Sequence, residues 1–345
     1  MERIIKQVVG IDVGSKELVV CLGKMNDELF KELCSYRSFR NTPEGFKQLV
    51  QWAGELSSKD VPMQYVMEAT GAYHEGLAYY LEEKQCGVSI VLPNKINHYF
   101  KTLDVKSVTD KTASEAIALF GLERNLNLWH SPHPIHKKLR QLTRERDQLV
   151  QERTMVKNQF HAEQAEALPN TQSIARMKQR IDLLNEQESI ILKEIKELVQ
   201  SDSELKKQVE IISTIPGVGI LTAATVLAET NGFDLIQSKK QLTSYAGLDV
   251  REKQSGTSVK GKPSISKRGN RYLRKALHLP ALAAIRHEQR YKNQFARLLS
   301  RHGIKMKAAV AVQRKLLELM YTLFKTGKPF DQNYKPTGSS VERKN

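Results

Sequence analysis

Three acidic residues stand where an isolated carboxylate would be costly. Asp12 lies within an apolar, β-branched run, Glu68 closes a second strand-like run, and Asp110 precedes a helix-like run. A carboxylate in such places needs a partner charge or a cation, and hard cations take oxygen ligands. Two bound cations can activate a nucleophile and stabilise a leaving oxygen in phosphodiester cleavage. Together the three acids predict a metal site. Taken singly, Asp12 could be a turn residue and Asp110 a helix N-cap.

A serine near the C-terminus is the second candidate for chemistry. Ser255 precedes Gly256 in a Gly-, Ser- and Lys-rich stretch, 249–266, which we expect to be a loop. A serine can attack a DNA phosphate and conserve the bond as a covalent phosphoserine. Ser258, Ser264 and Ser266 lie in the same stretch, so the residues alone leave Ser255 as one candidate among several. We expect the flanking cations to contact phosphates: Lys260, Lys262, Lys267, Arg268, Arg271 and Arg274.

A tight turn upstream also suggests phosphate contacts. Pro216, Gly217 and Gly219 separate two helix-like stretches. Glycines let backbone N–H groups approach a phosphate, and the N-terminus of the following helix favours negative charge. The pattern is similar to a helix-hairpin-helix element, which grips nucleic-acid backbones. The alternative is a plain turn between packed helices.

The charge of the chain is concentrated in its last third. The net charge is +16; residues 239–345 hold 25 Lys and Arg against 6 Asp and Glu (+19), whereas the rest holds 29 against 32 (−3). So lopsided a distribution is typical of a protein that binds a polyanion. The alternative is a basic tail without a partner.

Several classes of protein are disfavoured by composition. No apolar run approaches the ~20 residues that span a bilayer, and charges fill the start of the chain where a signal peptide is apolar. The cysteines, Cys21, Cys34 and Cys86, form no CxxC or Cys/His pattern. We therefore expect a cytoplasmic protein without a membrane partner, a zinc site or disulfides.

The elements that must position these residues follow from periodicity. Strand-like and helix-like runs alternate over residues 1–130 and predict an α/β domain with a mixed sheet. Apolar residues spaced by three, four and seven over 137–160 and 174–209 predict a coiled-coil hairpin within 131–210. Its exposed apolar seam suggests self-association. Residues 211–330 are expected to be a mostly helical basic domain, and 331–345 a flexible tail.

Taken in order, these motifs resemble those of DEDD-type insertion-sequence transposases. Residues 10–16 (Gly-Ile-Asp-Val-Gly-Ser-Lys), 68–71 (Glu-Ala-Thr-Gly) and 109–111 (Thr-Asp-Lys) resemble the RuvC-like domain of that family. Residues 245–249, 254–256 and 265–274 resemble its C-terminal transposase domain. The two sets span almost the whole chain in the family's order.

The resemblance implies a function and a set of partners. It implies a RuvC/RNase H-like α/β domain, a coiled-coil spacer and a mostly α-helical domain in which Ser255 is the nucleophile. It implies Mg²⁺ (or Mn²⁺) held by Asp12, Glu68 and Asp110, a guide non-coding RNA, and donor and target DNA in a bacterial or archaeal cytoplasm. It further implies homodimers that pair into a tetramer, in which the acidic domain of one protomer completes a site with the serine of another.

The chain departs from the family pattern at one position. The family has a second Asp three residues after the third acid, which would fall on position 113, and here Ala113 stands there. Residues three apart share a helix face, whereas Glu115 lies about 140° around the helix from Asp110 and cannot substitute. Either a ligand was lost naturally, or an inactivating replacement was introduced; we favour the second.

Two other functions stay open on the sequence. One is a junction-resolving or structure-specific nuclease that uses the carboxylates and water, with Ser255 incidental. The other is a non-catalytic nucleic-acid-binding protein, for which Ala113 is the best argument. Loss of cleavage in a serine variant would exclude the first, and dependence on a divalent metal would exclude the second.

Overall fold

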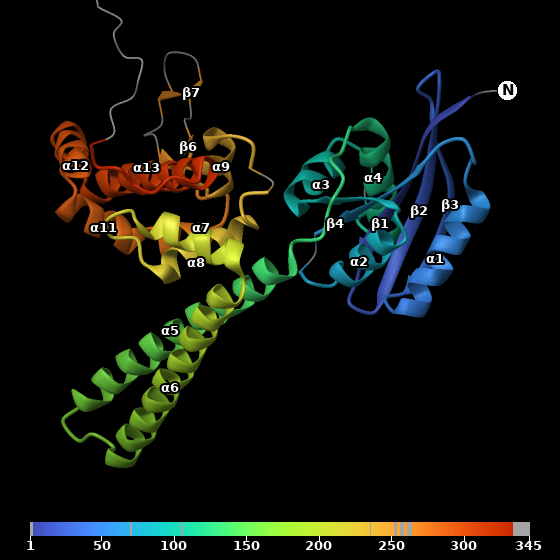
Figure 1. Ribbon diagram of the computed structural model, residues 1–345. Coiled ribbons are helices and arrows are strands. Elements are labelled where there is room, and N and C mark those ends of the chain that lie inside the picture. Colours follow the sequence, from blue (N-terminus) through green and yellow to red (C-terminus); the bar gives the residue numbers. More distant parts are fainter. Residues whose placement is uncertain are drawn as a thin grey trace, which may run out of the picture. The chain divides into compact units, whose positions relative to one another are not determined.

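The N-terminal part of the chain is built on a five-stranded sheet. The computed structural model (Figure 1) describes residues 3–69, 71–103, 105, 107–234, 236–251, 254–255, 259–260 and 264–333. It divides the chain into two units, residues 1–131 and 132–345. In the first unit the strand order is β3-β2-β1-β4-β5. The strands are β1 (Ile4–Val13), β2 (Glu17–Asn26), β3 (Lys31–Arg40), β4 (Met63–Glu68) and β5 (Gly87–Val91).

The direction of the strands defines the fold of this unit. β1, β2 and β3 form an antiparallel meander, whereas β4 pairs with β1, and β5 with β4, in parallel. This mixed sheet, with helices between the parallel strands, has the RuvC-like α/β arrangement. The predicted fold class of the N-terminal domain is confirmed.

Helices cover both faces of the sheet because its strands are apolar on both sides. Val9 and Ile11 of β1 share a core with α1 (Pro43–Leu56) and α2 (Glu75–Glu83). Val8 faces the other way and shares a core with α3 (Pro93–Phe100) and α4 (Asp110–Glu123). Successive side chains of a strand point to opposite faces, so even-numbered residues of β1 face α4. The α3 helix was not predicted.

The second unit begins with a helical hairpin. Helices α5 (Pro134–Gln164) and α6 (Thr171–Ser201) have 31 residues each and pack side by side (Figure 1). A buried charge joins them, because Glu188 of α6 pairs with Arg146 and Arg153 of α5. The second predicted arm, 174–209, is in fact two helices. The side chain of Asp202 accepts a hydrogen bond from Leu205 N (2.7 Å) and starts α7 (Ser203–Ser213).

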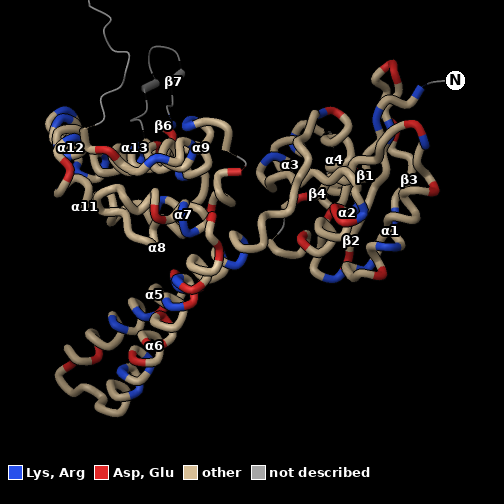
Figure 2. Tube along the Cα trace, in the orientation of Figure 1, with Lys and Arg blue, Asp and Glu red and all other residues tan. Residues whose placement is uncertain are grey.

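The rest of the unit is mostly helical, as predicted, around one apolar core. Its helices are α8 (Ile220–Thr230), α9 (Lys239–Tyr245), α10 (Arg271–Ala276), α11 (His278–His287), α12 (Gln289–His302) and α13 (Lys305–Thr326). Figure 2 marks Lys and Arg, which recur along α12, a helix without any acidic residue.

The predicted loop over 249–266 contains short strands instead. β6 (Val250–Arg251) pairs with β9 (Ser264–Ile265), and β7 (Gln254–Ser255) pairs with β8 (Val259–Lys260), both antiparallel. Two-residue strands carry too little periodicity to be recognised in the sequence.

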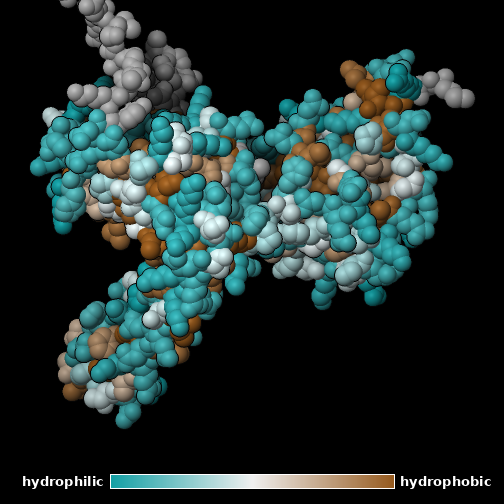
Figure 3. Space-filling model, viewed as in Figure 1, coloured by the Kyte–Doolittle hydropathy of each residue, from teal (hydrophilic) through white to brown (hydrophobic). Residues whose placement is uncertain are grey.

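Apolar side chains reach the surface in a few places. In Figure 3, brown atoms gather at the turn between β2 and β3, where Leu29 and Phe30 are exposed. No helix of the described residues is long and apolar enough to cross a membrane.

Candidate metal and nucleic-acid sites

Asp12 and Glu68 end neighbouring strands on the same face of the sheet. β1 pairs with β4 so that Gly10 lies opposite Val66, and each acid follows two residues later. Val66 faces α4, because a Cβ on Gly121 would lie 2.9 Å from Val66 Cγ2. Residues two apart in a strand share a face, so both acids lie on the α4 side.

Helix α4 rests directly on β1 because position 10 has no side chain. A Cβ on Gly10 would lie 2.2 Å from Ala118 N and 2.5 Å from Ser114 O, distances that no side chain tolerates. Near its other end the helix meets Val8, whose Cγ1 would lie 2.8 Å from a Cβ on Gly121. The helix therefore runs opposite to β1, and its first turn approaches the end of the strand.

Asp110 is the first residue of that turn. Thr109 is the N-cap, accepting a hydrogen bond from Thr112 N (3.2 Å), while Thr109 N donates to Thr112 Oγ1 (2.8 Å). This capping box fixes where α4 begins. Ala113 lies in the same turn, half-buried, and offers only a methyl group where the family has a carboxylate.

The charges at this edge of the sheet repel one another. Burial is the main cause that raises the pKa of Asp12 to about 6, and the negative charges of Asp110 and then Glu68 raise it further. A hydrogen bond from the Val13 backbone acts in the opposite direction. Asp110 and Glu68 thus both lie within electrostatic reach of Asp12.

These residues fit a hard divalent cation in two respects. All three are carboxylates, the ligands that Mg²⁺ takes in proteins, and a cation would offset the repulsion that Asp12 experiences. Their side chains are not in the positions of a bound-metal site, because in the described part of the chain no three His, Cys, Asp or Glu side chains are arranged to hold a metal. Ala113 supplies no further oxygen.

In the second unit, the predicted glycine turn joins α7 to α8, but packing accounts for one of its glycines. Gly217 has φ +85°, and a Cβ there would lie 2.8 Å from Ala283 Cβ and 3.0 Å from Pro280 O of α11. Gly219 is the N-cap of α8, and a Cβ there would meet nothing within 4 Å. A contact between a phosphate and Pro216, Gly217 or Gly219 stays a prediction.

Ser255 lies in a β-hairpin rather than in an unstructured loop. In β7 it pairs with Val259 of β8, and the two strands flank residues 256–258. The side chains of Ser255 and Lys260, and residues Gly256 and Lys262, lie outside the described residues.

The remaining predicted phosphate contacts lie around α10. Arg274 also has a structural role, because its Nη1 donates to Ala246 O (2.9 Å) and Gly269 O (3.0 Å). The guanidinium of Arg271 lies over the ring of Tyr272, 4.9 Å from the centroid. Arg268 is exposed, and Lys267 faces the cavity described below.

A buried carboxylate ties this segment to the helical hairpin. Glu229 of α8, whose side chain is 1% exposed, accepts two hydrogen bonds from Arg144 of α5, at 2.7 and 2.8 Å. Asn270 Nδ2 donates to the same carboxylate (2.6 Å), while Asn270 Oδ1 accepts from Tyr272 N and caps α10. The Tyr245 hydroxyl donates to Glu229 O (2.8 Å). Sequence analysis missed this network, since no local pattern links residues 144, 229 and 270.

Two segments quoted above for their family resemblance pack against each other here. A Cβ on Gly269 would lie 2.5 Å from Gly247 N and from Tyr245 O. Gly247 itself has φ +66°, a backbone conformation that glycine adopts without strain. The two glycines therefore bring the segment 245–249 against the start of α10.

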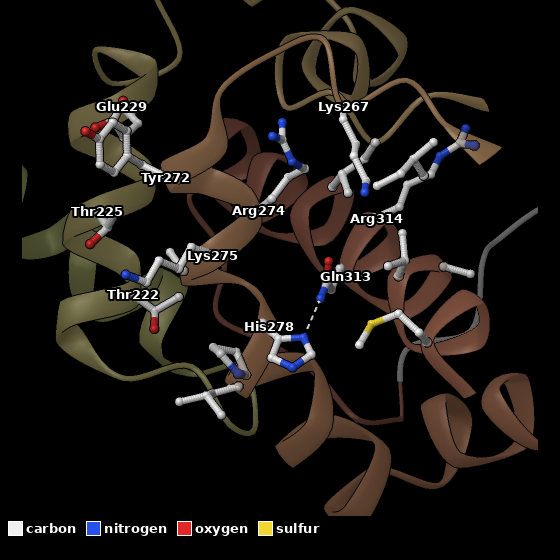
Figure 4. A pocket seen from close by; sticks show the side chains of 18 of the residues that line it. Thr222, Thr225, Glu229, Lys267, Tyr272, Arg274, Lys275, His278, Gln313 and Arg314 are labelled. Carbon is white, nitrogen blue, oxygen red and sulfur yellow. Dashed lines mark hydrogen bonds between the residues drawn. The ribbon is translucent and has the colours of Figure 1, made fainter. Parts of the chain in front are cut away.

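A cavity of about 1360 Å³ opens beside this network (Figure 4). It is lined by α5, α8, α10, α11, α12 and α13, and by the paired strands β6 and β9, which flank β7 and β8 in the sequence. Its Lys and Arg residues are Arg144, Arg146, Lys267, Arg274, Lys275, Arg301, Lys307 and Arg314. Two of the predicted phosphate contacts, Lys267 and Arg274, thus line this concave site together with six other cations.

The chain combines an α/β domain, which has three acids at one edge of its sheet, with a basic helical domain. Family models match both parts. Residues 9–168 match the DEDD transposase model of IS110, and residues 209–296 match the model described as Transposase IS116/IS110/IS902 family.

Similarity to characterised relatives extends over almost the whole chain. It is 30% identical over 338 residues to the pilin gene-inverting proteins of Moraxella lacunata and Moraxella bovis, covering 95% of this chain and 98% of each relative. It is 25% identical to the transposase for insertion sequence element IS1111A of Coxiella burnetii, covering 75% and 76%. The chain therefore belongs to the IS110 family of transposases.

Among solved structures, the similar chains include RuvC of T. thermophilus in complex with a Holliday junction substrate. It is 14% identical, with a TM-score of 0.26, and the match covers 33% of this chain and 90% of RuvC.

Proposed function

We propose that this protein is an RNA-guided DNA recombinase of an insertion sequence, and that it exchanges strands through a covalent phosphoserine on Ser255. The observation that carries the proposal is the placement of Asp12 and Glu68 on the sheet face that α4 covers, with Asp110 in the first turn of α4, in a chain of the transposase family. Three carboxylates at one edge of a sheet are suited to phosphoryl chemistry rather than to structural support. The basic hairpin and cavity of the second unit supply the complementary surface for DNA.

The chemistry assigned to Ser255 conserves the energy of the DNA backbone. The Ser255 Oγ–P bond forms as the bond between phosphorus and a deoxyribose oxygen breaks, and the serine proton passes to the departing oxygen. The reverse reaction with the hydroxyl of another strand rejoins the DNA and regenerates the serine. No external energy source is needed, because one phosphoester replaces another at each step.

The acidic site assists this reaction through charge. Asp12, Glu68 and Asp110 would hold Mg²⁺ or Mn²⁺, which would offset the charge of the phosphate when bound. Lys267, Arg268 and other cations near the hairpin would stabilise the additional negative charge of the transition state. The guide RNA, the homodimer and the tetramer of the proposal rest on the family resemblance, and the +19 charge of residues 239–345 accommodates RNA as well as DNA.

A strand-exchange assay tests the proposal. The protein is purified with the RNA that accompanies it, and recombination between donor and target DNA is measured for the parent chain and Ala113→Asp. Ser255→Ala and the matched Ser258→Ala are then each combined with Ala113→Asp. We expect Ser255→Ala to abolish exchange and Ser258→Ala to retain it. Cleavage without exchange that survives Ser255→Ala would instead identify a nuclease, and binding without any metal-dependent cleavage a non-catalytic protein.

A further inference from the structure

The cavity of the second unit leaves large apolar side chains uncovered. Leu279 is 73% exposed, Met306 58% and Ile304 56%, and all three line it. Apolar surface of this size, gathered in a concave site, marks a place where a ligand binds. It is not explained by phosphate contacts, which require only charge.

The wall around this apolar surface is strongly positive. Its acidic residues are Asp147 and Glu229, and both are paired, Asp147 with Lys275 and Glu229 with Arg144. Lys267, Arg274 and Arg314 come from three different segments and lie around the same opening (Figure 4). The cavity therefore favours an anionic ligand that also has apolar faces.

A polar pair in the wall is held in a fixed orientation. Gln313 of α13 is buried, and its Nε2 donates to Nδ1 of His278 at the start of α11 (3.0 Å) (Figure 4). The bond occupies one ring nitrogen of His278, and Nε2 remains as a donor for a phosphate or a base.

We propose that this cavity binds an unpaired segment of the DNA strand next to the phosphate that Ser255 attacks; the assignment rests on the proposed function. A duplex stacks its base faces internally and presents phosphates and groove edges. An unpaired strand exposes its base faces as well, and sites for single strands combine a positive groove with aromatic side chains on which bases stack. Here Tyr272 lines the same wall, and the exposed Leu279, Ile304 and Met306 would supply further apolar surface for base faces within a ring of cations.

The position of the cavity favours DNA over other polyanions. Val250, Ser264 and Ile265 belong to the paired strands at the base of the Ser255 hairpin, and the same residues line the cavity. Because β6 and β9 flank β7 and β8 in the sequence, a DNA strand bound in the cavity would lie next to the segment that carries the proposed nucleophile. Binding of RNA in the same cavity is the alternative that the binding test below distinguishes.

Neutral substitutions on the cavity surface test this assignment. Met306→Ser and Leu279→Ser remove apolar contact without changing charge, and both residues are exposed, so folding should be unaffected. Leu168→Ser, at the turn between α5 and α6, is the matched control because Leu168 is 91% exposed and does not line the cavity. Binding of the full chain to fluorescent oligonucleotides of about 12 nucleotides is measured by anisotropy for single-stranded DNA, single-stranded RNA and duplex DNA. Thermal unfolding verifies that each variant is folded.

We expect Met306→Ser and Leu279→Ser to weaken binding to single-stranded DNA about fivefold or more, the effect of one lost base contact. Binding to duplex DNA and all binding by Leu168→Ser should change little. Equal losses for duplex and single strands, a selective loss of RNA binding, or no loss would overturn the assignment. Adducts of Ser255 are scored separately, with each cavity variant combined with Ala113→Asp. Adducts on Ser255 together with normal strand binding in both cavity variants would refute the cavity site alone. Selective loss of strand binding in the cavity variants, with no adduct on Ser255 even in Ala113→Asp itself, would refute the nucleophile alone.

Discussion

Replacement of Arg144 should destabilise the second unit strongly, although Arg144 itself is partly exposed. Its guanidinium donates two hydrogen bonds, of 2.7 and 2.8 Å, to the carboxylate of Glu229, whose side chain is 1% exposed. In Arg144→Met the carboxylate would stay buried with only Asn270 as a side-chain donor. Removing one partner of a buried pair typically costs about 3–5 kcal/mol, because an uncompensated charge remains.

The reciprocal replacement should cost less. In Glu229→Leu the charge left behind is Arg144, whose side chain is 41% exposed and can be hydrated. We expect a loss of about 1–2 kcal/mol, chiefly from the unpaired Asn270. The double variant Arg144→Met/Glu229→Leu should be more stable than Arg144→Met, since two apolar residues replace the pair.

Urea unfolding of the full chain, followed by a signal from the second unit, measures these differences. For a unit of this size, a loss of about 3–5 kcal/mol corresponds to roughly 6–20 °C in Tm. Lys193→Met is the control, because Lys193 and its partner Glu197 are 79% and 65% exposed, and such a change should stay within about 0.5 kcal/mol. If Arg144→Met is as mild as the control, the network does not hold the unit together as described.

Three further predictions concern the acidic site and the basic surface. Ala113→Asp should raise or restore strand exchange and Ala113→Asn should do so poorly, because a carboxylate is missing beside Asp110; equal activity of the parent chain in the exchange assay would contradict the four-acid site. Without added metal, the raised pKa of Asp12 means that its carboxyl group binds a proton more tightly in the folded state than in the unfolded state. The free energy of unfolding should therefore fall as the pH rises from about 4 to about 6. In Asp12→Asn, the Tm measured by thermal unfolding should depend less on pH over that range. The affinity for nucleic acid should fall by a factor of about 10³–10⁵ between roughly 50 and 200 mM salt if ~6–10 phosphates are contacted. Most of this salt dependence should be due to Lys and Arg of residues 239–345. An affinity that does not change with salt concentration would contradict a surface dominated by phosphate contacts.

The positions of the acids could be predicted because each depends on local pattern. Asp12 and Glu68 close runs of apolar residues, and Thr109 provides the cap that places Asp110 at a helix start. The parallel pairing of β1 with β4 then follows from the alternation of strands and helices. The close packing of α4 on Gly10 could not be predicted, because it depends on which helix crosses which strand.

Long-range contacts account for what the sequence did not reveal. Glu229 pairs with a residue 85 positions earlier, and the cavity is assembled from residues between 143 and 314. Gly217 shows the converse problem. Its place in a Pro-Gly-x-Gly turn predicted a contact with a phosphate. The structure shows that it also packs against α11, a role that no local sequence pattern predicts.

The most direct test of the account is the identity of the residue that becomes covalently attached to DNA. The Ala113→Asp protein is incubated with its RNA, target DNA and Mg²⁺, the adduct is trapped by denaturation, and the protease-digested peptide is sequenced by mass spectrometry. The account predicts a nucleotide linked to Ser255, and no adduct in Ser255→Ala, which should still bind DNA. An adduct on another residue, or strand exchange that proceeds without any adduct, would contradict it.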